Sequence, residues 1–189
     1  MTSTTEERKN DHLEICLKEN VQARRVTTGF EDLYLLHKAL PEINRKEINL
    51  STRFLDHSFS APLLVESMTG GTPAAAKVNK AIARAVEELG LGMGVGSQRA
   101  AIEDEKLERT FAIVRKKAPN AFLVANIGGV QLVNGFGLKE AQRAIDMIQA
   151  DALAIHLNPL QEAVQPEGQT NFEKILEKIG EIAGRVNVP

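Results

Sequence analysis

The chain has 189 residues, enough to bury one sizeable core, and its 23 basic and 25 acidic side chains give a formal net charge of −2. This balance argues against nucleic-acid partners, and with no tryptophan and one tyrosine there is little aromatic surface for stacking on bases. The single cysteine, Cys16, excludes an internal disulfide framework, and no apolar run is long enough to span a membrane. We therefore expect a cytoplasmic protein without membrane partners.

Residues 1–61 follow no repeating pattern and are expected to form an N-terminal extension that acts as a substrate-binding arm. Residues 5–20 are predicted to form a short helix, and residues 42–50 and 54–59 to be extended. The segment Arg8-Lys9-Asn10-Asp11-His12 combines two cations, a carboxylate and an imidazole. Such a segment is most often a solvated helix face, but it can also fold over an anionic substrate.

From Pro62 onward, four short apolar runs are each followed by turn residues, which is typical of buried parallel strands. Short links between parallel strands imply right-handed βα units, and four units make half of a (β/α)₈ barrel. The expected fold class is therefore α/β, with residues 62–189 as the N-terminal half of a TIM (β/α)₈ barrel. Residues 186–189 would begin a fifth strand. The four expected strands are residues 63–65, 91–95, 122–124 and 152–155.

Four helices are predicted to alternate with these strands, and two of them carry clear terminal signals. Thr72 and Pro73 suit an N-cap and the first helical position, and Gly90 suits a left-handed C-terminus. Thr170, with Glu173 three residues later, predicts a capping box for the last helix. The expected helices span residues 73–89, 103–117 and 138–150, with the last one beginning after residue 170.

Polar clusters follow all four expected strands. Because the carboxyl ends of parallel strands meet at one edge of a sheet, these clusters predict one wall of an active site. They are Ser67-Met68-Thr69-Gly70-Gly71, Ser97-Gln98-Arg99, Asn126-Ile127-Gly128-Gly129 and residues 156–162.

Glycines are prominent at the first two strands. In residues 67–71, two adjacent glycines let backbone amides approach a flat or anionic ligand, but they equally suit a tight βα turn. The usual dinucleotide and P-loop fingerprints are absent. Gly90, Gly92, Gly94 and Gly96 alternate through the second strand, which favours close packing over contact with a cofactor ring.

Charged and amide side chains suggest phosphate and metal binding. Arg99 at a strand end can pair with a phosphate through two hydrogen bonds. Glu162 suits a magnesium ion, which needs only one or two protein carboxylates when phosphates supply other ligands, and Gln161 beside it can orient an uncharged group. His156 alone cannot make a zinc site. The charge of Glu66, near a strand interior, has no evident partner in the sequence.

Together these motifs resemble the type 2 isopentenyl-diphosphate isomerase family, whose members are FMN-dependent (β/α)₈ barrels that interconvert isopentenyl diphosphate and dimethylallyl diphosphate. They occur in the family's order and span the whole chain. The motifs are Arg8-Lys9-x-Asp11-His12, Met68-Thr69-Gly70-Gly71, Ser97-Gln98-Arg99, Asn126-x-Gly128 and His156-Leu157-Asn158-x-x-Gln161-Glu162.

The resemblance implies a role for each matching residue. The flavin contacts would be Met68, Thr69, Gly70, Ser97 and Asn126. The diphosphate contacts would be Arg8, Lys9, His12, Ser97, Gln98 and Arg99. His156, Asn158 and Gln161 would line the substrate, with His156 and Gln161 as the catalytic pair, and Glu162 would bind Mg²⁺.

The resemblance also implies reduced FMN as the acid–base centre, NAD(P)H as its reductant, and a homotetramer or homo-octamer. Family members continue through four further strands, so we expect this chain to be a truncated portion that is inactive alone. Two alternatives remain open from the sequence. One is another FMN-dependent barrel oxidoreductase, and the other is a non-catalytic half-barrel module.

Overall fold

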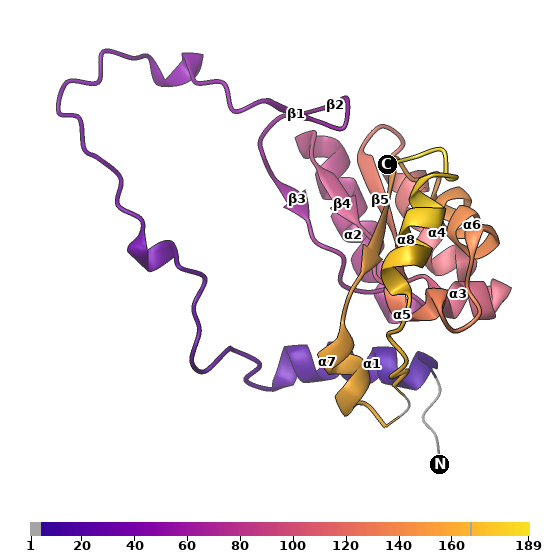
Figure 1. The fold of residues 1–189 in the computed structure, drawn as a ribbon. Coiled ribbons are helices and arrows are strands. Elements are labelled where there is room, and N and C mark those ends of the chain that lie inside the picture. The colour runs from indigo at the N-terminus through magenta and orange to yellow at the C-terminus, as the bar shows by residue number, and fades with distance from the viewer. Residues whose placement is uncertain (1–4, 167) are drawn as a thin grey trace.

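The computed structural model describes residues 5–166 and 168–189, which form a parallel sheet with flanking helices, a hairpin and a long N-terminal arm (Figure 1). The strands are β1 Thr52–Phe54, β2 His57–Phe59, β3 Leu64–Val65, β4 Gly92–Gly94, β5 Phe122–Gly128 and β6 Ala152–His156. The α-helices are α1 Thr5–Lys18, α2 Pro73–Leu89, α3 Arg99–Glu103, α4 Glu108–Lys117, α5 Gly129–Leu132, α6 Leu138–Ile148, α7 Pro159–Val164 and α8 Ile175–Ala183. The 3₁₀ turns are η1 Phe30–Asp32, η2 Arg45–Glu47 and η3 Glu105–Leu107.

Strands β3, β4, β5 and β6 lie in sequence order and pair in parallel. Gly92 stands opposite both Leu64 and Phe122, and Val124 stands opposite Ala152. The parallel α/β class expected from the apolar runs is confirmed. Strand β5 is longer than expected, because it continues to Gly128 and so takes a polar cluster into the sheet.

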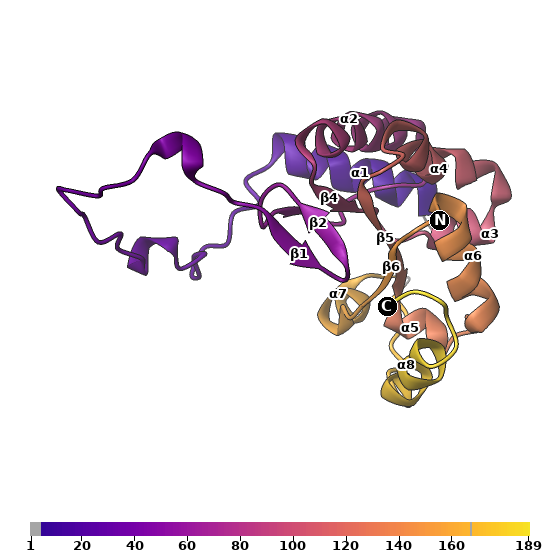
Figure 2. The same cartoon turned by 90° about the horizontal axis from the view of Figure 1, so that it is seen from above.

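The core lies between the sheet and the row of helices α2, α4 and α6 (Figure 2). Each helix contributes one fully buried face, with Val86, Phe111 and Ile148 at most 1% exposed, and these side chains meet Leu123 and Ile127 of β5. Burial of each such side chain contributes about 1.5–3 kcal/mol. The stability of the sheet therefore rests on this face, to which the strand ends and the site are anchored.

Helix α2 forms as its terminal residues predict. The hydroxyl of Thr72 accepts a hydrogen bond from the backbone N–H of Ala75 at 3.1 Å, and Pro73 occupies the first turn. Gly90 ends the helix with φ of +63°. These signals are local, so the sequence is sufficient to place both ends.

The second predicted helix is wrong over its first turn. Helix α4 begins at Glu108, and residues 99–103 form the separate helix α3 directly after the strand end. Asp104 interrupts the two with an extended backbone, and its side chain accepts from the N–H of Lys106. An aspartate that bonds its neighbouring backbone competes with the helix.

The predicted capping box of the last helix is also wrong. Helix α8 begins at Ile175, after Lys174 with φ of +62°. The N–H of Glu173 donates a hydrogen bond to the side-chain oxygen of Asn171 at 3.1 Å. This short asparagine turn replaces the bond expected from Thr170. The segment after β6 holds the short helix α7, with Pro159 in its first turn.

Residues 19–51 leave the body of the molecule as an extended arm (Figure 1). The prediction that residues 42–50 are extended is wrong at η2, where the side chain of Asn44 accepts from the N–H of Lys46 and starts a turn. No residue of η1 or η2 is buried. The predicted helix at the start of the chain is confirmed as α1.

Residues 54–59, predicted to be extended, form most of an antiparallel hairpin of β1 and β2. Leu55 and Asp56 at its turn both have positive φ, at 46° and 63°, as two-residue hairpins require. The rings of Phe54 and Phe59 pack on Phe122 with centroids 5.9 and 5.5 Å apart. The hairpin therefore covers the start of β5, at the end of the sheet away from the polar clusters.

At the other edge, Val186 and Val188 pack on the core, and the N–H of Leu153 in β6 donates to the carbonyl of Pro189 at 2.8 Å. Residues 186–189, predicted to begin a strand, make this hydrogen bond to β6 but form no strand ladder in the described structure. Across the helices of residues 5–166 and 168–189, none combines the length and apolarity needed to cross a membrane.

Candidate functional site

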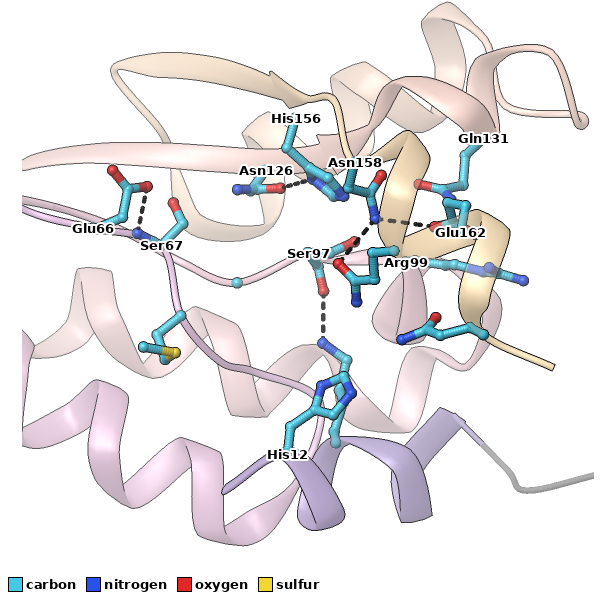
Figure 3. Close-up of a pocket in the computed structure, with 15 residues that line it drawn as sticks. His12, Glu66, Ser67, Ser97, Arg99, Asn126, Gln131, His156, Asn158 and Glu162 are labelled. Atoms are coloured by element: carbon cyan, nitrogen blue, oxygen red, sulfur yellow. Dashed lines mark hydrogen bonds between the residues drawn. The ribbon is translucent and has the colours of Figure 1, made fainter. Parts of the chain in front are cut away.

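A pocket of about 330 Å³ lies where the carboxyl ends of the strands meet helices α1 and α7 (Figure 3). It brings together side chains from all four strand ends and from the N-terminal helix, as the polar clusters predict. Ten residues singled out from the sequence line it: Lys9, His12, Met68, Ser97, Arg99, Asn126, His156, Asn158, Gln161 and Glu162.

Asn126 and His156 form a hydrogen-bonded pair across neighbouring strands. The Nδ1 of His156 lies 2.7 Å from Oδ1 of Asn126, since the parallel register places His156 opposite Gly128, two residues beyond Asn126 on β5. An amide oxygen can only accept, so Nδ1 carries the proton and Nε2 presents a lone pair when the ring is neutral. Burial lowers the pKa of His156, an effect to which Lys9 adds and which Glu162 opposes. The neutral ring is thus favoured in the pocket.

Glu162 on α7 is a carboxylate only 7% exposed. Its Oε1 accepts from the amide of Asn158 at 3.1 Å, and its Oε2 accepts from the N–H of Gln169 at 2.8 Å. These neutral donors orient the charge and leave lone pairs on both oxygens. Asn158 also donates to Oε1 of Gln161 at 3.2 Å, so the three side chains of this turn are held as one group (Figure 3).

This donor set fits a magnesium ion that is shared with phosphate oxygens, because such an ion needs one or two carboxylates and keeps several waters. Glu162 supplies the carboxylate, and Asn158 fixes its position. Within the described ranges no three His, Cys, Asp or Glu side chains are arranged to hold a metal by themselves. A metal here would therefore depend on the substrate for its remaining ligands.

Helix α1 brings cations to the pocket from far away in the sequence. The ammonium group of Lys9 donates to the carbonyl of Ser97 at 3.1 Å and lies 5.9 Å from the centre of the Phe111 ring. His12 lines the same side (Figure 3). Arg8 lies in α1, but its side chain is outside the described part of the structure.

Arg99 lines the pocket from the first turn of α3, directly after the end of β4. Its Nε donates to Glu103 at 2.7 Å, four residues along the same helix. The guanidinium group has five N–H donors, so others remain for an anion in the pocket. The structure therefore places Arg99 in the pocket at the end of β4, and its contact with a phosphate stays a prediction.

Gln98, implied by the resemblance to contact the diphosphate, points away from the pocket. It is fully buried, and its amide group donates to the carbonyl of Ala144 at 2.8 Å while its Oε1 accepts from the N–H of Asn126 at 2.9 Å. The start of α3 turns this side chain into the core as it turns Arg99 outward. The structure thus places Gln98 under Asn126, where it supports the strand end.

Of the three expected flavin contacts at the first cluster, only Met68 exposes its side chain in the pocket, with 72% exposure. Thr69 is buried, and its carbonyl accepts from Asn79 and from the N–H of Gly96. A Cβ at Gly70 would overlap the ring of Phe111. Thr69 and Gly70 are therefore held in place by packing and are not among the residues that line the pocket, and their contact with a flavin stays a prediction.

The alternating glycines serve close packing, as favoured from the sequence. A Cβ at Gly96 would lie 2.7 Å from the backbone of Thr69, and a Cβ at Gly92 would lie 2.8 Å from side chains of Leu64 and Phe59. A Cβ at Gly94 would overlap the hydroxyl of Ser67. The glycines let β3 and the following turn approach β4.

Five lining residues were given no individual role from the sequence, although Ser67 belongs to one of the predicted clusters: Glu66, Ser67, Gly96, Gln131 and Gln165. Glu66 turns back on its own chain, where its carboxylate accepts from the N–H of Ser67 at 2.9 Å, which accounts for its place at the end of β3. Gln131 sits on α5, a short helix that the sequence pattern did not reveal. The only available signal was a glutamine soon after a polar strand end.

Residues 2–122 match the sequence profile of the FMN-dependent dehydrogenase family. This match covers more than half of the chain, and the chain belongs to that family. The α/β fold with a parallel sheet that fits this family agrees with the sheet topology of the chain.

Curated relatives make the comparison more specific. An isopentenyl-diphosphate delta-isomerase of Methanococcoides burtonii is 53% identical over 98% of this chain and 51% of the relative. Similar proteins of the same name occur in Archaeoglobus fulgidus, 53% identical over 98% of this chain and 53% of the relative, and in Nostoc sp., 48% identical over 100% and 53%. The chain spans about half the length of the curated relatives it matches. The resemblance identified from the motifs is confirmed.

Proposed function

We propose that the protein interconverts isopentenyl diphosphate and dimethylallyl diphosphate with the help of a flavin. The observation that carries this proposal is the pairing, in one pocket, of cations from α1 and α3 with a buried carboxylate from α7. Lys9, His12 and Arg99 can bind a diphosphate, and Glu162 can hold the divalent cation that a diphosphate attracts. The names and high identity of the relatives support this substrate.

The neutral wall of the pocket suits FMN. Met68, Ser97 and Asn126 line it. The substrate has no carbonyl to make its protons acidic, so side-chain bases alone are poorly matched to the reaction. Reduced FMN, kept reduced by NAD(P)H, would supply the acid–base chemistry when bound. The family to which the chain belongs supports the flavin.

The chain's own residues would act by placement. Cations and the metal at Glu162 would fix the diphosphate, while Gln161 and His156 would orient the five-carbon tail. Asn126 fixes the ring of His156 through Nδ1, and Asn158 fixes both Gln161 and Glu162. The side chains proposed to contact the substrate and the metal are thus positioned by hydrogen bonds from the side-chain amides of Asn126 and Asn158.

We further propose that residues 62–189 are the first half of a (β/α)₈ barrel, with residues 1–61 as an extension, in a cytoplasmic homo-oligomer that binds neither nucleic acid nor membrane. The four parallel βα units in sequence order support the barrel. A second candidate function is that of another FMN-dependent oxidoreductase, which the family's description favours. Isomerisation without net consumption of NAD(P)H would separate the two.

The substitution Glu162→Gln in the complete protein tests the role of the metal. We expect turnover that depends on Mg²⁺ to fall by about a hundredfold or more, since the charge at the phosphates is lost, while FMN affinity stays unchanged. Flavin fluorescence titration and steady-state kinetics over a range of Mg²⁺ concentrations measure both. An equal loss of FMN affinity would contradict the assigned role.

Glu66→Gln is the matched control, because Glu66 lines the same pocket but bonds only its neighbouring N–H in the described contacts. This variant should keep its dependence on Mg²⁺. If both variants respond alike, the effect belongs to the charge of the pocket in general rather than to a metal at Glu162.

A further inference from the structure

Gln131 carries a buried oxygen that the proposed function leaves unexplained. The side chain is 4% exposed and lines the pocket, and its Oε1 has no hydrogen-bond partner among the described residues. Its amide group donates to Oε1 of Gln169 at 3.4 Å. A buried acceptor without a donor is costly and rare, so such an atom at a binding site indicates a missing donor.

The orphan oxygen faces the free edge of His156. A Cβ at Gly128 would overlap Oε1 of Gln131 and would lie 3.0 Å from Nε2 of His156, so these two atoms border the same small space. The opposite edge of the ring is already bonded through Nδ1 to Asn126. Nε2 of the neutral ring is therefore an acceptor as well. Two acceptors meet at this corner of the pocket, and the absence of a side chain at Gly128 makes room for the amide of Gln131 beside the ring.

A group that binds next to these two acceptors must carry hydrogen-bond donors. The ionised oxygens of a diphosphate only accept hydrogen bonds, and a hydrocarbon tail makes none, so neither satisfies the pair. Three groups carry suitable N–H or O–H donors: an ordered solvent water, a water on a bound divalent cation and an N–H of the flavin. Gln131 is linked to the carboxylate of Glu162 through Gln169, whose N–H donates to that carboxylate at 2.8 Å.

We propose that Gln131 is a further binding residue of the site, whose Oε1 accepts a hydrogen bond from an N–H or O–H donor of the bound ligands at the Nε2 edge of His156. The link to Glu162 favours a water on the divalent cation as that donor. The inference deepens the proposed function and rests on it. Figure 3 shows Gln131 on the same side of the pocket as Glu162 and Asn158.

The test compares Gln131→Met with Gln131→Glu in the complete protein. Met removes the acceptor at similar size, whereas Glu keeps an acceptor oxygen. Binding of Mn²⁺ in the presence of inorganic pyrophosphate is measured by calorimetry or electron paramagnetic resonance, and FMN binding is measured separately by fluorescence. We expect Gln131→Met to weaken Mn²⁺ binding about three- to tenfold with FMN affinity unchanged, and Gln131→Glu to retain Mn²⁺ binding.

Gln165→Met is the matched control, since Gln165 lines the same pocket and is not in contact with Gln169 or Glu162 through any side-chain hydrogen bond of the described residues. It should bind both ligands normally. A loss confined to FMN in Gln131→Met would support the proposal and assign the donor to the flavin. Unchanged binding of both ligands, or an equal loss of both with a lowered melting temperature, would overturn it. Failure of the unaltered protein to bind either ligand would instead refute the proposed function.

Discussion

At the scale of single residues, the polar side chains of the pocket are fixed by other polar side chains. His156 is held by the side chain of Asn126, and Glu162 by the side chain of Asn158 and the backbone N–H of Gln169. Asn126 and Asn158 keep further donors or acceptors that can bind a ligand. These hydrogen bonds orient His156 and Glu162 before any ligand binds, which lowers the entropy cost of binding.

The buried ring of His156 predicts a dependence of stability on pH. Because its pKa in the folded chain is lowered from the ordinary value of 6.5, the unfolded chain binds more protons between the two pKa values. The contribution of His156 to the free energy of unfolding is thus complete above about pH 6.5 and is lost as the pH falls through the lower folded pKa. Titration of its ring resonances by NMR measures the folded pKa directly.

The variant His156→Gln provides the control, since it removes the titrating ring. Its free energy of unfolding, from urea denaturation at several pH values, should vary less between pH 5 and 6.5 than that of the unaltered chain. A ring that titrates at or above 6.5 would contradict the effect of burial described for this pocket.

At the scale of helices and strands, one side chain joins α4 to the β-sheet. The guanidinium group of Arg115 donates to the carbonyls of Ala118 and Ala121 at 3.1 and 2.9 Å, to that of Gln149 at 2.7 Å, and to the carboxylate of Asp151 at 2.8 Å. It therefore connects the end of α4, the start of β5 and the turn between α6 and β6. These segments set the register of the two strands that carry Asn126 and His156.

We predict that Arg115→Lys lowers the free energy of unfolding by about 1–3 kcal/mol, because an ammonium group cannot reach several carbonyls in a planar fork. Urea denaturation measures the change. Arg84→Lys, at an exposed position of α2, is the matched control and should change stability by no more than about 0.5 kcal/mol. Equal effects in both variants would show that the fork of Arg115 does not hold these segments.

At the scale of the whole molecule, the described residues expose extensive apolar surface. A groove of about 290 Å³ next to the pocket is lined mainly by apolar side chains of α5, α8 and the segment from β6 into α7, among them Leu157 at 64% and Leu176 at 84% exposure. Tyr34, Leu35 and Leu36 on the arm are at least 87% exposed. Contiguous surface of this kind normally contacts a partner or drives association.

The open edges of the sheet add to this tendency. In the described sheet β3 pairs only with β4, and β6 pairs only with β5. Unpaired strand edges are templates for association. We predict that this 189-residue chain, expressed by itself, self-associates and binds FMN weakly. Sedimentation velocity and flavin titration test this, with Leu176→Glu expected to reduce the association; a monodisperse monomer that binds FMN tightly would disprove it.

The sequence alone determined those features whose causes are local or periodic. Short apolar runs placed the four parallel strands, and Thr72 and Gly90 placed both ends of α2, because each signal lies within a few residues of its effect. Polar clusters after the strands predicted the pocket, since parallel strands bring their carboxyl ends together. Eight of the predicted site residues lie in these clusters and line the pocket together, whereas their roles stay predictions.

Only the tertiary structure decided which way individual side chains face and which distant segments meet. Gln98 and Arg99 are neighbours in the sequence, yet the start of α3 buries the first and turns the second into the pocket. Lys9 reaches Ser97 across 88 positions. Gln131 became part of the site through α5, which has no periodic signal because four residues are too few to show one. Orientation depends on the packing of whole elements, and no local pattern contains that information.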